Sequence, residues 1–259
     1  MNWSALPRLL SCVTAFICSI WLPQMTHAQS TNSVVIWPID PIIENRDRST
    51  SVWIENPGNQ PIFLQVRIFG WTQDGNENRV TEQADITGTP PLIRVEPAQR
   101  QLIRLTRLVP PQPGQEKAYR VIIDEIPQSP AGAATDQTAT KAGAAIQFRM
   151  RYSLPLYVYG RGIGSKAYAP ALPRLEWRNV QSGNKPAIEI RNIGSLHGKL
   201  TSVSARRPDG SVIKLDTVSG HVLPGAVMRW IANAAVPDNA VLDASINGAP
   251  STIIPHWAP

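Results

Sequence analysis

Proline is spread along nearly the whole chain, and it limits the length of any helix more than any other feature does. The sequence has 24 prolines in 259 residues, against an average of roughly 5%. Inside a helix, proline removes a hydrogen bond and clashes with the preceding turn. No stretch between the prolines shows a helical period of about 3.6 residues over three turns. The sequence therefore predicts short strands and no long helix.

Short runs of apolar and β-branched residues occur in both halves of the chain. Ile62–Phe69 alternates between apolar and other side chains, and turn signals such as Asn56-Pro57-Gly58-Asn59 and Asp209-Gly210 separate the runs. Strands spaced by turns at intervals of about 8–12 residues are typical of a sandwich or barrel. We expect strands at 34–38, 50–55, 62–69, 102–105, 118–126, 146–154, 174–178, 187–191, 199–205, 212–215, 227–231 and 241–246.

Residues 1–28 have the pattern of a secretory signal peptide. Arg8 is the only charged side chain before Asp40, and the apolar stretch Leu9–Leu22 follows it. This stretch is shorter than the roughly 20 residues that a spanning helix needs. The triplet Thr26-His27-Ala28 predicts cleavage after Ala28, and an uncleaved anchor is the alternative.

Cleavage removes both cysteines, Cys12 and Cys18, so the mature chain has no thiol for a disulfide, a nucleophile or a metal. Lys plus Arg falls from 25 to 24 while Asp plus Glu stays at 19, which gives a net charge of +5. This charge forms no block, so we expect no nucleic-acid binding. The remaining histidines have no metal-ligand spacing. We expect no metal, cofactor, small-molecule substrate or enzyme activity.

Two glycine-containing motifs look like functional motifs but lack the structural context. Gly160–Lys166 resembles a phosphate loop, yet Pro170 and Pro173 follow where a helix would have to begin. Ser182–Lys185 matches Ser-x-x-Lys but lies between two strands, where we expect a turn. The first motif is better explained as a linker. We therefore predict an N-terminal domain at 29–159, a linker at 160–173 and a C-terminal domain at 174–259.

Ile146–Leu154 is the clearest alternation in the chain. Its apolar side chains fall on one face, and the loosely composed segment Pro127–Ala145 precedes it. Pro155 near its end favours an edge position. An edge strand with an apolar face risks aggregation, so a chain that keeps one is predicted to use it for pairing with a partner. An ordinary half-buried strand is the alternative.

Several short segments follow one another in a specific order and spacing through the first domain. They are Ser51-Val52-Trp53-Ile54-Glu55-Asn56, Thr89-Pro90-Pro91, Arg94-Val95-Glu96-Pro97, Leu102-Ile103-Arg104-Leu105, Ala118-Tyr119-Arg120 with Asp124-Glu125-Ile126-Pro127, and Arg151-Tyr152-Ser153-Leu154-Pro155-Leu156-Tyr157. In this order they resemble the periplasmic chaperones of the chaperone–usher pilus pathway. The Trp71-Thr72-Gln73-Asp74-Gly75 segment is most similar to the divergent branch that serves spore-coat-type fimbriae.

The resemblance implies an all-β fold of two immunoglobulin-like β-sandwich domains in an L-shaped arrangement. It implies a periplasmic chaperone that stabilises pilus subunits by donor-strand complementation and delivers them to an outer-membrane usher. A secreted immunoglobulin-like adhesion or structural protein and a secreted hydrolase remain as alternatives. The partner-binding residues implied for the donor strand are Ala144, Ile146, Phe148, Met150 and Tyr152.

The family usually holds the subunit's C-terminal carboxylate with an arginine on the first strand and a lysine on the last. Here these positions fall at Asp40 and near Ser153. Glu116 matches a position that helps to fix the angle between the domains, although its basic partner falls at Tyr157. Arginine suits a carboxylate because it can donate two parallel hydrogen bonds. The candidate replacements for the anchor are Arg151, Arg149 and Arg104.

Overall fold

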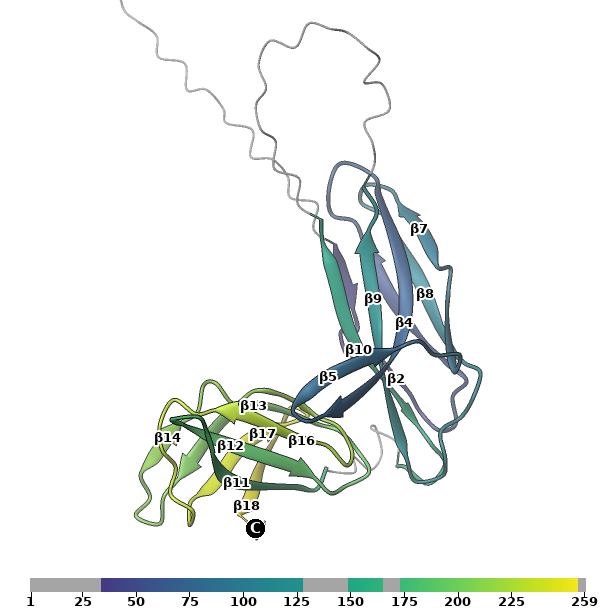
Figure 1. Ribbon diagram of the computed structural model, residues 1–259. Coiled ribbons are helices and arrows are strands. Elements are labelled where there is room, and N and C mark those ends of the chain that lie inside the picture. Colours follow the sequence, from purple (N-terminus) through teal and green to yellow (C-terminus); the bar gives the residue numbers. More distant parts are fainter. Residues whose placement is uncertain (1–33, 128–148, 165–172, 256–259) are drawn as a thin grey trace, which may run out of the picture. The chain divides into compact units, whose positions relative to one another are not determined.

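The computed structural model describes residues 34–127, 149–164 and 173–255, and every regular element in these ranges is a β-strand (Figure 1). Among these residues there is no helix that could cross a membrane. The expected all-β fold is confirmed. It follows from short apolar runs that prolines keep from forming helices.

Two sheets form the first sandwich. The four-stranded sheet has the order β1 (Val35–Trp37), β3 (Ser49–Glu55), β8 (Arg100–Arg107) and β6 (Ile86–Thr89). The six-stranded sheet has the order β2 (Ile42–Ile43), β10 (Arg151–Tyr159), β9 (Glu116–Glu125), β4 (Ile62–Asp74) and β5 (Glu77–Thr81), with β7 (Leu92–Val95) also paired to β4.

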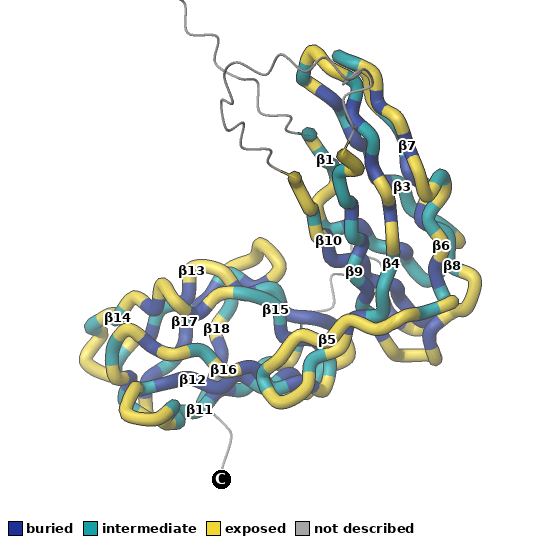
Figure 2. Tube along the Cα trace, turned by 45° about the horizontal axis from the view of Figure 1, so that its top comes forward, coloured by how far each residue is buried: buried dark blue, intermediate teal, exposed yellow. Residues whose placement is uncertain are grey.

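The core of the first sandwich lies between these sheets. Successive side chains of a strand point to opposite faces, so every second residue reaches this core. Figure 2 shows the resulting alternation of buried and exposed positions. The hairpin strand β5 is exposed throughout. The largest fully buried apolar side chains of this core include Ile43, Ile54, Leu64, Ile103, Leu105, Ile123 and Leu156.

The second sandwich consists of one continuous hydrogen-bonded sheet whose two halves share a core. Trp177 and Ile190 from one half belong to the same buried cluster as Leu200 and Leu242 from the other. The strands are β11 (Leu175–Ser182), β12 (Lys185–Asn192), β13 (Gly198–Arg206), β14 (Val212–Lys214), β15 (Gly220–Val222), β16 (Val227–Ile231), β17 (Val241–Ile246) and β18 (Ala249–Pro255). Their order is β14-β13-β17-β18-β11-β12-β16, and β15 pairs with β13.

Predicted turns are confirmed, but several predicted strands differ in extent: β4 and β11 run on to Asp74 and Ser182, beyond the expected ends at 69 and 178. The Ser182–Lys185 tetrad is the turn between β11 and β12, and Asp209-Gly210 lies in the turn between β13 and β14. The strand expected at 146–154 instead spans Arg151–Tyr159 among the described residues, and residues 149 and 150 are not strand. It continues beyond Pro155 because the following residues pack into the core.

Candidate functional site

Strand β10 has one edge that is only partly paired. It pairs with β9 along all nine of its residues, but with β2 only at Tyr157 and Val158. The Tyr157 N–H donates to the Pro41 carbonyl on the β2 side. Since backbone groups alternate sides along a strand, the N–H groups of Arg151 and Ser153 also point away from β9. Within the described ranges, no strand pairs with this edge at residues 151–156.

The side chains of β10 divide the strand into two parts. All residues from Leu154 to Tyr159 are buried, whereas Arg151 and Ser153 are exposed. Tyr152 is half-buried, packs against the core of the first sandwich, and accepts a hydrogen bond at its hydroxyl from the Val34 N–H at 3.3 Å. Burial of β10 therefore decreases toward the N-terminal end of the strand.

The structure places two of the five predicted partner-binding residues. Met150 lies just before β10 and is 41% exposed, which is unusual for a large apolar side chain. Tyr152 already contacts its own core, so it has less surface to offer a partner. Ala144, Ile146 and Phe148 lie outside the described residues.

The three predicted carboxylate anchors do not come together. Arg151 forms an ion pair with Asp124, which also pairs with Arg67 at 2.6 Å. Burial alone would raise the pKa of Asp124, but hydrogen bonds from these two arginines hold it below its usual value. Arg149 is exposed before β10 begins, and Arg104 is exposed on β8, in the other sheet.

Arg120 is a cation that the sequence analysis did not single out. It lies on the central strand β9, opposite Pro155 of β10, and its guanidinium is 3.6 Å from the ring centroid of Trp71. Burial lowers its pKa, so its charge is costly where it stands. No described carboxylate forms an ion pair with Arg120. The alternation of side chains along β9 places Arg120 on the face of the sheet that points away from the core. The order of the strands in the sheet then determines which residues of β4 and β10 lie beside it.

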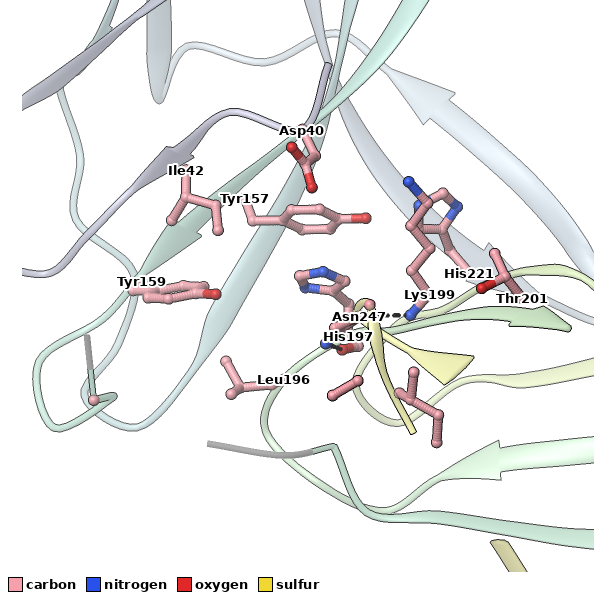
Figure 3. Close-up of a pocket in the computed structure, with 14 residues that line it drawn as sticks. Asp40, Ile42, Tyr157, Tyr159, Leu196, His197, Lys199, Thr201, His221 and Asn247 are labelled. Carbon is pink, nitrogen blue, oxygen red and sulfur yellow. Dashed lines mark hydrogen bonds between the residues drawn. The ribbon is translucent and has the colours of Figure 1, made fainter. Parts of the chain in front are cut away.

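A buried polar link joins the two sandwiches. Glu116 of β9 accepts hydrogen bonds from the His197 backbone N–H at 3.0 Å, and its other oxygen lies 2.8 Å from His197 Nδ1. The His197 ring stacks on Tyr157 with 3.4 Å between centroids (Figure 3). The basic partner of Glu116 is therefore not at the position of Tyr157. A histidine 81 residues away takes that role, and Tyr157 provides the surface on which it stacks.

A second link lies beside it. The Gln73 side chain at the end of β4 donates to the His221 carbonyl at 2.9 Å and accepts from the Leu223 N–H at 2.8 Å. The Trp71 and His221 rings meet edge to face at 5.4 Å. Tyr157, His197 and His221 from these two links line a cleft of about 460 Å³, whereas Trp71, Gln73 and Glu116 line a separate cleft of about 480 Å³. The polar lining residues of the first cleft include Asp40, Tyr157, His197, Lys199, Thr201 and His221 (Figure 3).

The family described as pili and flagellar-assembly chaperone, PapD N-terminal domain, matches residues 33–163. The chain belongs to this family of pilus-assembly chaperones. Its members are chaperones and not enzymes, which agrees with a site made of an open strand edge and an arginine. Within the described ranges, no group of three or more His, Cys, Asp or Glu side chains is placed to hold a metal.

Solved structures are similar over nearly the whole chaperone. A chain in the CsuC–CsuE chaperone–tip adhesion subunit pre-assembly complex, from archaic chaperone-usher Csu pili of Acinetobacter baumannii, is 27% identical, with a TM-score of 0.66. The match covers 85% of this chain and 97% of that one. None of the curated proteins searched matches the sequence.

Two more distant structures show the same fold. The Escherichia coli chaperone DraB is 14% identical, with a TM-score of 0.59, over 88% of this chain and 97% of its own. The Pseudomonas aeruginosa chaperone CupB2 is 18% identical, with a TM-score of 0.55, over 84% of this chain and 97% of its own. The expectation of a pilus chaperone is confirmed by the family match, and family membership argues against the adhesion-protein and hydrolase alternatives.

Proposed function

We propose that this chaperone works in the periplasm, where it holds a pilus subunit by donor-strand complementation until an outer-membrane usher receives it. The observation that carries the proposal is the edge of β10 at residues 151–156, which no described strand covers. A strand of another polypeptide can add to such an edge through backbone hydrogen bonds. The exposed Met150 lies at the start of this edge.

The side chains of the donor segment supply most of the expected affinity. In the register of β10, even-numbered residues from Leu154 to Val158 face the core. The same alternation in sequence puts Ile146, Phe148 and Met150 on one face, with Ala144 before them. Burying three large apolar side chains in a subunit groove contributes about 5–9 kcal/mol before ordering costs. Each backbone hydrogen bond adds about 1 kcal/mol.

The subunit's C-terminal carboxylate is proposed to bind at Arg120. This arginine lies beside β10, is half-buried, and forms no ion pair with a described carboxylate. Arg151 is a weaker candidate because Asp124 already pairs with it. Arg149 is exposed outside the strand, and Arg104 lies in the other sheet. A half-buried cation without an ion-pair partner gains most from an incoming carboxylate, because the pair restores the charge balance.

Co-expression with a fimbrial subunit tests the donor strand. We expect soluble subunit to accumulate with the wild-type chaperone and not with Phe148→Asp, because a carboxylate cannot enter an apolar pocket without a large desolvation cost. Gln147→Asp is the matched control, since it places the same charge on the opposite face of the segment. Equal subunit recovery with Phe148→Asp and wild type would remove this segment from the interface.

Delivery to an usher needs a separate test. The A. baumannii relative was solved in a complex described as pre-assembly in a chaperone-usher system, which supports the same role here. We expect the chaperone–subunit complex to bind outer-membrane fractions of cells that produce the usher. Fractions from cells without the usher are the control. Equal binding to both fractions would contradict the delivery step.

A further inference from the structure

Two buried polar atoms of residues lining the cleft have no hydrogen-bond partner. They are the hydroxyl oxygen of Tyr157 and Nε2 of His221. A buried polar group left without a partner costs roughly 1–3 kcal/mol, and native proteins rarely keep one without a reason. Figure 3 shows the Tyr157 hydroxyl directed toward the side of the cleft where His221 and Lys199 lie. Two such atoms in one cleft leave hydrogen-bonding capacity that a water molecule or a ligand group can fill.

The charges around His221 favour an anion over a cation. Arg120 on β9 and Lys199 on β13 both act on it as positive charges, and His197 adds to them when protonated. Asp40, before β2, is the one negative charge acting on it among the described residues. Trp71 of β4 and Tyr157 of β10 complete its surroundings without a charge. The charges acting on His221 are thus mainly positive, while Glu116 and Asp40 act on the neighbouring Tyr157 hydroxyl as negative charges that Arg120 opposes.

We propose that a carboxylate bound at Arg120 also accepts hydrogen bonds from His221 and Tyr157, and that its binding is accompanied by uptake of one proton from solvent onto the His221 ring. This inference rests on the proposed binding of a subunit carboxylate in this cleft. No covalent bond forms or breaks. The protonated imidazole donates to the carboxylate, and the phenol keeps its own proton because burial raises its pKa above the ordinary value.

The free chaperone holds His221 neutral. Burial is the main cause, and the positive charge of Arg120 adds to it; together they lower the pKa of His221 from 6.5 to about 4. A carboxylate beside the ring opposes both effects and moves the pKa back toward 6.5. Between the His221 pKa of the free protein, about 4, and the higher pKa of the complex, binding is strongest at the acidic end. It weakens by about tenfold per unit as the pH rises through this range. Below a pH of about 3.5 the partner's own terminal carboxyl becomes protonated and binding weakens again.

NMR of the histidine ring protons tests the proposal with the whole chaperone, free and in the complex that co-purifies with its subunit. The probe is the full-length subunit itself. We expect His221 to titrate near pH 4 in the free protein and at least one unit higher in the complex, with His221→Asn used to assign the signal. In free Arg120→Gln the His221 pKa should also rise, because one repelling charge is gone.

The outcomes separate the two proposals. A complex in which His221 titrates as it does in the free protein overturns proton uptake and leaves the donor-strand function standing. Failure to isolate any complex removes the proposed function, and the inference falls with it. A rise of the His221 pKa in the complex, absent when Arg120→Gln is used to form it, supports the shared carboxylate site. A rise that persists in Arg120→Gln would contradict the role given to Arg120.

Discussion

The two ends of β10 differ sharply in burial and in strand pairing. From Leu154 to Tyr159 every residue is buried, and the last residues pair on both sides. From Arg151 to Ser153 the strand pairs with β9 alone, and two of its three residues are exposed. One strand therefore serves as core at one end and as an open edge at the other. The buried end fixes the register in which the open end is presented to a partner.

The largest expected effect on stability comes from truncating a side chain at the buried end of β10. Leu156 is 0% exposed, so Leu156→Ala should lower the free energy of unfolding by about 2–5 kcal/mol. Met150→Ala, at the open end, should change it by no more than about 0.5 kcal/mol while lowering the amount of subunit complex recovered. Urea unfolding and co-purification measure the two effects. Similar losses of stability in both variants would contradict the division of the strand.

A smaller effect, on binding alone, is expected when the half-buried cation Arg120 is removed. Arg120→Gln should weaken the subunit complex by about 10–100-fold, because the partner carboxylate would be left without its counter-ion. Arg151→Gln is the matched control, and we expect less than about threefold from it since Arg151 is exposed and paired with Asp124. Competition between labelled and unlabelled chaperone for the subunit measures the ratio. Equal effects of the two substitutions would contradict Arg120 as the carboxylate anchor and would favour Arg151, at the open end of β10.

The link between the sandwiches should have an intermediate effect on stability. Glu116 is buried and bonded twice to His197, so Glu116→Ala leaves the His197 backbone N–H without a partner and should cost about 1–3 kcal/mol. Glu96→Ala removes an exposed carboxylate from the surface pair with Arg94 and should cost less than about 1 kcal/mol. Thermal unfolding compares them. Equal costs would show that the link contributes no more than a surface pair.

The smallest effect concerns acid stability at the open end. The folded-state pKa of Asp124 is held below its ordinary value, so its ion pairs stabilise the fold above the unfolded pKa of about 3.9 and are lost as the pH falls through the folded pKa. Its arginine partners are largely exposed, which limits the contribution to less than about 1 kcal/mol. Asp124→Asn should therefore lower the urea midpoint slightly at pH 7 and leave it unchanged near pH 2. An equal shift at both values would contradict this assignment.

Sequence reasoning predicted the class of fold because it depends on local pattern. Alternating apolar residues and prolines specify strands wherever they occur, as in Ile62–Phe69. It misjudged the extent of β10 because Pro155 looks like the end of a strand. In the structure the Pro155 nitrogen falls on the side away from β9, where no ladder hydrogen bond is lost.

The parts of the site that were missed depend on contacts between distant segments. Arg120 looks like any polar residue of an alternating strand, and only the sheet order puts it between Phe69 and Pro155, with its guanidinium over the Trp71 ring. The partner of Glu116 is a histidine in a connection of the second sandwich, where no local pattern points to it. The predicted donor residues Met150 and Tyr152 differ in burial because the core of the first sandwich reaches only as far as Tyr152.

Amide hydrogen exchange at Arg151 and Ser153 tests the open edge most directly. Both N–H groups point away from β9, so they should exchange rapidly in the free chaperone and become protected in the subunit complex, while Tyr157, already bonded to Pro41, stays protected in both. Protection of Arg151 and Ser153 in the free protein, or unchanged exchange in the complex, would contradict the account.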